Sequence, residues 1–301
     1  MGSVFADAPL ARRLETTEGH GNAAFIDAQA RREPYSGAIR TTIAGTLVMF
    51  AGVGSPITQT FCLGILERPT DRDFDAIERF FTSRGSAVFH EVSPHAGADL
   101  YAALAGRGYK PIELSNVMYQ PIDPPSRPGA ASAFAEASAD QPAWSRRSSP
   151  DLSRAEADAS TGLVVNPRLR VRMVDNSEAD WYGTIASRGW SEVPEVLPFI
   201  HGFARSSVEA ATCFVAELAG QAIATAALFM HDGVALLAGA STVPEGRRNG
   251  AQLALLDARL RLAVARGCDL AMMVAAPGSA SQRNAERNGF KVAYTRTKWQ
   301  L

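Results

Sequence analysis

The sequence is poor in cysteine, and this scarcity limits the classes of protein to which it can belong. Its 301 residues include three cysteines, Cys62, Cys213 and Cys268, each among apolar neighbours and without the spacing of a metal site. A disulfide framework or a zinc ribbon needs more cysteines at closer spacing. We therefore expect no metal centre and three buried free thiols in a reducing compartment, which indicates a cytoplasmic protein.

The sequence also has no excess of charge of either sign and no long apolar run. The formal net charge is −1, which provides no electrostatic footprint for nucleic acid. No stretch is long and apolar enough to span a membrane, and the N-terminus lacks the basic and then apolar pattern of a secretion signal. We expect neither nucleic acid nor a membrane as a partner.

What the chain does contain is enough apolar sequence for more than one core. Hydrophobic residues make up 46% of it, and its length is typical of about two domains. Between the two halves, residues 122–167 are rich in Pro, Ala, Ser and Asp and low in hydrophobicity, which is typical of a linker. The sequence thus predicts one domain over 1–121, a linker over 122–167 and a second domain over 168–301.

The most informative segment runs from Val243 to Leu256. An apolar run precedes this segment. The segment itself begins with a short basic loop that contains Arg247, Arg248 and Gly250, and it continues into leucines at helical spacing. This order predicts a strand, a loop and a helix. Unpaired N–H groups and the helix dipole make such a helix N-terminus an anion site, suited to phosphate or pyrophosphate. The loop lacks the Gly-Lys-Ser/Thr of a Walker A loop and the Gly-x-Gly-x-x-Gly dinucleotide fingerprint.

The loop resembles motif A of the GNAT superfamily of N-acetyltransferases, Arg/Gln-x-x-Gly-x-Gly/Ala. Arg247 and Gly250 fill the first and central positions, while Gln252 stands where Gly or Ala is usual. In that family the loop holds the pyrophosphate of acetyl-coenzyme A, and the end of the preceding strand aligns its pantetheine arm. The resemblance, together with the helix that follows the 269–274 strand, implies these cofactor-binding residues: Ser241, Thr242, Val243, Arg247, Arg248, Asn249, Gly250, Ala251, Gln252, Leu253 and Asn284.

The segments around the loop follow the order of elements in the GNAT fold. Strands are expected over 169–174, 212–218, 221–230, 234–239, 269–274 and 290–299, and helices over 176–186, 196–208, 251–266 and 279–288. The ending Asn288-Gly289-Phe290 resembles a signature of the family, and the resemblance covers about 168–301. It implies an α/β fold with a mixed, mostly antiparallel sheet flanked by helices.

The first half of the chain repeats the pattern of the second. Residues 100–119 and 281–299 both run from helix through Gly, an aromatic residue and Lys into a strand. Strands are expected over 38–44, 46–53, 59–65 and 87–94, with a helix over 71–84. A repeat this long indicates domain duplication, so we predict two tandem acetyltransferase-like domains.

The two copies differ at the strand-to-helix junction. The first copy has no glycine loop there, and Thr70, Asp71 and Asp73 open its helix. Acidic residues favour a helix N-terminus but repel pyrophosphate. We expect the first copy not to bind coenzyme A in this way. Two roles stay open for it: shaping the acceptor site or an interface, or structural support.

The acceptor side of the second copy is less distinctive. The family shapes it with the first two helices and the segment between them, where Trp190, Glu192 and Glu195 lie. Either carboxylate is a candidate for holding a cationic amine and Trp190 for stacking on it, with an exposed acidic loop as the alternative. Positions at which the family often has Asn and Tyr hold Gly278 and Ala285, so the general acid and base are not identified.

These observations predict an N-acetyltransferase that moves an acetyl group from acetyl-coenzyme A to an amine of a small molecule or peptide. The C-terminal copy would hold the cofactor. The departure at Gln252 and the missing Tyr leave two alternatives, a non-catalytic acyl-coenzyme A binder or sensor and an interaction protein.

Overall fold

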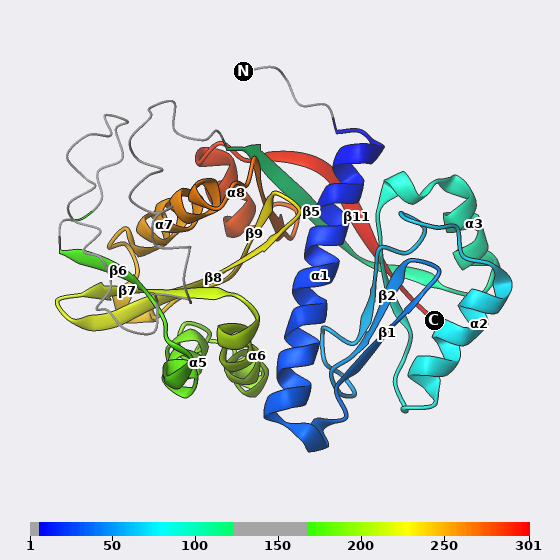
Figure 1. The fold of residues 1–301 in the computed structure, drawn as a ribbon, viewed down its shortest axis with the longest axis horizontal. Helices are drawn as coiled ribbons and strands as arrows, with labels where there is room; N and C mark the ends of the chain where they lie inside the picture. Colours follow the sequence, from blue (N-terminus) through cyan, green and yellow to red (C-terminus); the bar gives the residue numbers. More distant parts are fainter. Residues whose placement is uncertain (1–5, 123–165, 167) are drawn as a thin grey trace, which may run out of the picture. The chain divides into compact units, whose positions relative to one another are not determined.

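The computed structural model describes residues 6–122, 166 and 168–301 (Figure 1). Almost all of the predicted linker therefore lies outside the described residues. The chain divides into two compact units, each made of separate segments. Unit 1 consists of Met1–Pro121, Met230–Leu236 and Leu270–Leu301, and unit 2 of Ile122–Phe229 and Leu237–Asp269.

Unit 1 contains a mixed sheet whose strands come from both ends of the sequence. Its strands follow the order β1-β2-β3-β4-β11-β5-β10-β9, with β9 contributing only its first residues. The β3–β4 and β10–β9 pairs are parallel and the others are antiparallel. The elements are α1 (Ala8–Arg32), β1 (Ile39–Ile43), β2 (Thr46–Phe50), β3 (Gln59–Phe61), α2 (Asp71–Thr82), β4 (Phe89–Val92), α3 (Ala98–Gly106), β5 (Lys110–Pro121), β10 (Leu270–Ala275), α8 (Ala280–Arg287) and β11 (Lys291–Gln300).

The two copies of the repeat exchange their final strands within this sheet. β5 closes the first copy in sequence but pairs with β10, which belongs to the second copy. β11 closes the second copy but pairs with β4 of the first, and β5 and β11 also pair with each other. Trp299 of β11 accordingly packs in the core cluster formed by first-copy residues such as Phe74, Phe81 and Leu104. The last strand of each copy is thus held by the other.

Helix α1 has no counterpart among the elements expected from the sequence. Asp7 caps its first turn by accepting a hydrogen bond from the Leu10 amide at 2.9 Å, and Pro9 stands at the start, where its missing N–H costs nothing. The expected strand over 59–65 is also shorter, since it ends at Phe61. Cys62 and Gly64 have positive φ angles of 64° and 72°, which an extended strand does not permit.

Unit 2 contains a sheet of order β9-β8-β7-β6 with helices on both faces (Figure 1). α7 packs against β6 and β7, and α5 and α6 pack against each other on the opposite face. Tyr182, Ala204 and Ala227 belong to the core cluster between α5, α6 and the strands. The elements are β6 (Leu169–Met173), α5 (Ala179–Arg188), α6 (Leu197–Ala210), β7 (Thr212–Leu218), β8 (Gln221–His231), β9 (Val234–Thr242) and α7 (Ala251–Ala265).

The structure confirms the predicted fold class, a mixed, mostly antiparallel sheet flanked by helices. The compact units do not follow the predicted sequence boundaries, because the exchanged strands join each unit from a distant segment. The division at 121 and 168 therefore stays a prediction about the repeat. The three cysteines are free and buried, as expected, and none of the described helices is both long and apolar enough to cross a bilayer.

Candidate acyl-coenzyme A site

The loop between β9 and α7 is held in shape by its own backbone and one asparagine. Pro244–Gly246 forms a 3-10 turn, closed by a hydrogen bond from the Gly246 amide to the Val243 carbonyl at 2.9 Å. Asn249 Nδ2 then donates to the Gly246 and Arg247 carbonyls, both at 3.2 Å. The loop is therefore a fixed structure.

This loop presents a row of backbone donors. Arg248 and Gly250 have positive φ angles of 65° and 82°, which turn successive amides toward one side. The amides of 248–252 donate to no acceptor among the described residues. Gly250 is the N-cap of α7 and supplies no side-chain cap, so the positive end of a 15-residue helix is open. These features fit a phosphate or pyrophosphate group.

Arg247 and Arg248 differ in what they contact. Arg247 pairs with Glu192 through an Nη1–Oε1 contact of 2.7 Å, and this bond lowers the pKa of the Glu192 carboxyl. It also donates to the Gly189 carbonyl at 3.4 Å. Arg248 is exposed, and its guanidinium contacts no partner among the described residues. One arginine is thus available to an anion, and the other is held by a carboxylate.

Gln252, the departure from the motif, connects the start of α7 to the end of β9. Its Nε2 donates to the Ser241 carbonyl at 3.0 Å and to the Thr242 hydroxyl at 2.8 Å. Ser241 in turn donates its hydroxyl to the Ala186 carbonyl of α5 at 2.7 Å. The strand end, the loop and α5 therefore form one connected group.

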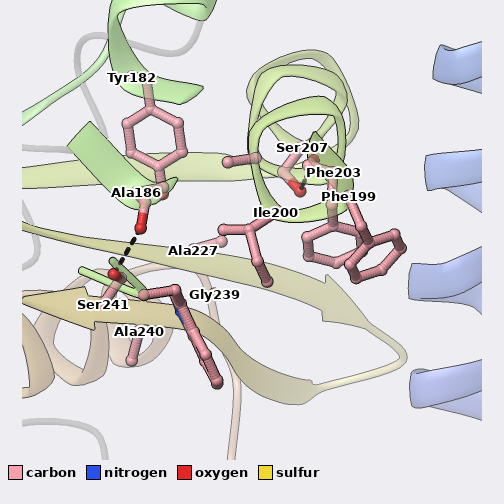
Figure 2. A pocket seen from close by; sticks show the side chains of 12 residues that line it. Tyr182, Ala186, Phe199, Ile200, Phe203, Ser207, Ala227, Gly239, Ala240 and Ser241 are labelled. Carbon is pink, nitrogen blue, oxygen red and sulfur yellow. Dashed lines mark hydrogen bonds between the residues drawn. The ribbon is translucent and has the colours of Figure 1, made fainter. Parts of the chain in front are cut away.

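A cavity of about 230 Å³ lies between α5, α6 and the strands β8 and β9 (Figure 2). Phe199 and Phe203 of α6 stack on each other in its wall, with ring centroids 5.8 Å apart. Its described lining consists of small, aromatic or aliphatic side chains and three hydroxyl groups, and none of these described residues is charged: Tyr182, Ala186, Trp190, Phe199, Ile200, Phe203, Ala204, Ser207, Ala227, Gly239, Ala240 and Ser241.

The hydroxyl groups around this cavity are already engaged. Ser241 donates to the Ala186 carbonyl and Ser207 to the Phe203 carbonyl, the latter at 2.8 Å. Burial, and then the nearby Cys213 thiol, raises the pKa of Tyr182 well above its usual value. Tyr182 is therefore neutral at ordinary pH, and none of the three hydroxyls is a ready proton acceptor.

A buried arginine supports the strands at the base of this cavity. Gly239 has a φ of 61° within β9, which distorts the strand there. Arg259 of α7, only 4% exposed, donates from Nη1 to the carbonyls of Ala227 and Ala238 at 3.3 and 3.4 Å. Burial lowers its pKa to about 10, so it stays charged at neutral pH. Nothing in the sequence marked Arg259 as a supporting residue.

The three residues predicted for the acceptor site do not lie together in the structure. Trp190 lines the cavity and is 43% exposed, so it stands at the mouth. Glu192 and Glu195 are exposed and do not line it, and Glu192 contacts Arg247 instead. The sequence reasoning did not single out Phe203, whose spacing of four residues from Phe199 on α6 was the available signal.

The remaining predicted positions fall outside this group. Asn284 lies on the exposed side of α8, in unit 1, and its contact with a cofactor stays a prediction. Ala285 is buried in the same helix. In the first copy, Thr70 and Asp73 cap α2 reciprocally, with the Thr70 amide donating to Asp73 Oδ2 at 2.8 Å. That helix start is closed by the protein's own side chains.

The acetyltransferase family described as GNAT matches residues 176–290. This segment is a GNAT domain. It includes the β9–α7 loop, the cavity and Asn284. No curated protein sequence matches the chain significantly.

Solved structures with the same fold cover almost the whole chain. A tandem GNAT protein from the clavulanic acid biosynthesis pathway has 12% identity and a TM-score of 0.55, covering 99% of this chain and 96% of its own. A GCN5-related N-acetyltransferase from Kribbella flavida has 15% identity and a TM-score of 0.52, covering 93% of both chains. The chain therefore has a tandem GNAT fold, as the internal repeat predicted.

Proposed function

We propose that this protein transfers an acetyl group from acetyl-coenzyme A to an amine of a small molecule or peptide. The observation that carries the proposal is the row of amides at 248–252 in front of the open N-terminus of α7, which donate to no acceptor in the part of the chain that the structure describes. In the C-terminal copy these amides and Arg248 would hold the pyrophosphate, with Arg247 joining them if it leaves Glu192. Membership of residues 176–290 in the GNAT family supports acyl transfer.

The transfer needs an uncharged amine beside the thioester. The amine nitrogen attacks the thioester carbon, the carbon–sulfur bond breaks, the thiolate of coenzyme A leaves, and the nitrogen loses a proton. When bound, acetyl-coenzyme A supplies the activated acyl group. The amides of 248–252 and Arg248 would bind its pyrophosphate, and the apolar cavity would hold the acceptor.

A second function is favoured by one contact. Gln252 covers the Ser241 carbonyl at the end of β9, where the family aligns the pantetheine arm. A protein that binds acyl-coenzyme A without turning it over would tolerate this contact. Steady release of free coenzyme A in the presence of an amine would exclude this non-catalytic alternative.

The first test is calorimetric titration with acetyl-coenzyme A. We expect one site per chain, since α2 of the first copy is closed by Thr70 and Asp73. Gly250→Glu places a carboxylate beside the open amides and should weaken binding at least about 100-fold, as expected for charge repulsion at an anion site. Because residue 250 has a φ of 82°, any side chain adds backbone strain, and Gly250→Ala controls for that strain.

The two variants separate the explanations. Gly250→Ala should keep most of the affinity, and Asp71→Ala in the first copy should keep all of it. Equal affinity in Gly250→Glu and the unaltered chain would show that the pyrophosphate binds elsewhere. Two sites per chain would show that the first copy also binds the cofactor.

A further inference from the structure

The cavity of unit 2 restricts the chemistry of the acceptor. It is bordered by Gly239, Ala240 and Ser241 of β9, and the same strand leads after Thr242 directly into the 244–250 loop. A molecule in the cavity therefore lies beside the strand that ends at the candidate pyrophosphate site. This position fits the acceptor of the proposed acyl transfer.

The lining selects an apolar and flat group. Phe199, Phe203 and Ile200 project from α6 into the wall (Figure 2). Trp190 also lines the cavity and is partly exposed, so it stands at the mouth. The opposite surface consists of Ala227, Gly239 and other small residues, and a Cβ on Gly239 would lie 3.3 Å from the Ala227 Cβ. An apolar cavity of ~150 Å³ is known to hold benzene. The volume of about 230 Å³ therefore has room for one ring and a substituent.

The lining also disfavours a cationic amine. Among the described residues, no carboxylate lines the cavity: Glu192 contacts Arg247, and Glu195 lies outside the lining. An ammonium group that enters such a cavity loses its hydration without gaining an opposite charge. Aliphatic amines are ammonium ions at neutral pH, whereas aromatic amines are uncharged.

The same lining offers no group to remove a proton before attack. Its hydroxyls are engaged in hydrogen bonds or buried, and the positions where the family often has Asn and Tyr hold Gly278 and Ala285. An amine that arrives uncharged needs no such base to become a nucleophile. After attack its nitrogen is strongly acidic, so its proton passes to water or to the departing thiolate without a positioned acceptor.

We propose that the acceptor is a weakly basic aromatic amine whose ring binds in the Phe199–Phe203–Trp190 cavity. This inference rests on the proposed acetyl transfer. It assigns Phe199 and Phe203 as residues that determine specificity, because they form the aromatic wall of the cavity. Trp190 would close over the ring from the mouth.

The test compares acceptors at saturating acetyl-coenzyme A, with release of free coenzyme A as the readout. Aniline and 4-methylaniline are the aromatic probes, and putrescine and a lysine-containing peptide are the cationic ones. We expect kcat/KM for the anilines to exceed that for the cationic amines at least 100-fold. Phe199→Ala and Phe203→Ala should each raise KM for aniline at least tenfold and leave the dissociation constant of acetyl-coenzyme A within twofold.

Two further variants complete the design. Phe199→Glu places a carboxylate at a half-buried wall position and should shift the preference toward putrescine, a gain that misfolding cannot produce. Trp181→Ala removes a partly exposed aromatic side chain of α5 that does not line the cavity, and it should change no constant for aniline.

The outcomes separate the two proposals. Turnover that favours putrescine or the peptide in the unaltered chain would overturn the aromatic acceptor and leave the acetyltransferase intact. If the KM for aniline is the same in Phe199→Ala, in Phe203→Ala and in the unaltered chain, the assignment of the cavity as the acceptor site is overturned. Intact acetyl-coenzyme A binding with no turnover of any amine would overturn both the acceptor and the enzymatic function.

Discussion

The contact between Arg247 and Glu192 shows how one side chain connects the anion site to the segment that carries Trp190. Glu192 follows Trp190 by two residues, and its carboxylate holds the guanidinium that the family directs at pyrophosphate. Both side chains are exposed, so the pair is screened by solvent and easily broken. If Arg247 joins the pyrophosphate as proposed, Glu192 competes with the cofactor for it, and Glu192 is not among the described residues that line the cavity.

Replacing Glu192 by Gln should strengthen the binding of acetyl-coenzyme A. The change frees Arg247 while keeping the shape of the side chain, and we expect an affinity about two- to fivefold higher at low salt, as is typical of exposed pairs. Calorimetry at 20 mM and 500 mM salt measures the effect, which should shrink at high salt. Glu195→Gln, an exposed carboxylate without this contact, is the matched control. A lower affinity in Glu192→Gln would mean that Glu192 helps to position the loop.

At this scale the sequence predicted local features well and assembled ones poorly. The loop is local, so Arg247, Gly250 and the start of α7 follow from neighbouring residues. The cavity brings together residues from 182 to 241 on four elements. Their separation along the sequence does not indicate how close they lie in the folded protein. The partner of Glu192 was missed for the same reason, since Arg247 lies 55 residues away.

Among the elements, α1 is the one that the sequence analysis overlooked. Glu15, Thr17 and Gly19 are buried between apolar positions such as Leu14 and Ile26, so the apolar pattern that marks most surface helices is interrupted. It is attached to β11 through charge. Glu15 accepts a hydrogen bond from the Tyr294 hydroxyl at 2.8 Å, and Arg296 pairs with Glu18 at 2.6 Å.

Glu15 makes the attachment of α1 sensitive to pH. Burial raises the pKa of its carboxyl from 4.5 to about 7, and the nearby Arg296 guanidinium offsets part of that effect. Between these values the folded protein binds more protons than the unfolded chain, so the free energy of unfolding falls as the pH rises from 4.5 to 7.

Glu15→Gln should remove this dependence, because an amide keeps an oxygen for Tyr294 and does not ionise. Urea unfolding of both proteins at pH 5 and pH 8 measures it, and the variant should lose less stability than the unaltered chain. Burial lowers the pKa of His90 to about 3, which acts in the opposite direction. His90 is present in both proteins, so its effect cancels in the comparison. Equal slopes would show that Glu15 does not carry the pH dependence.

The whole molecule is organised by the exchange of final strands. The repeat, the tandem fold and the order of elements were all readable from the sequence because they follow the chain. The exchange could not be predicted from the sequence, because the apolar pattern of a strand does not determine which other strand it pairs with. β5 pairs with β10 and β11 of the second copy, although strands of its own copy were also available. The boundaries at 121 and 168 therefore describe the duplication better than they describe folding units.

A fragment of residues 168–301 should not fold alone. Both sheet neighbours of β11 lie in the first half of the chain, so the fragment leaves a long strand unpaired. We expect it to be aggregated or to lack a cooperative urea transition. Co-expression with a 1–167 fragment should restore both solubility and a transition like that of the intact chain. A fragment that unfolds cooperatively by itself would show that the sequence boundaries mark an independent domain.

The exchange of strands also determines when the first copy can complete its sheet during translation. The first copy leaves the ribosome long before Lys291–Gln300 is made, so β4 lacks this neighbour until β11 has been synthesised. During that interval the nascent chain exposes an edge that can pair with another molecule, and the final contacts span most of the sequence. Termination of translation within Lys291–Gln300 would therefore damage the half of the protein that was made first.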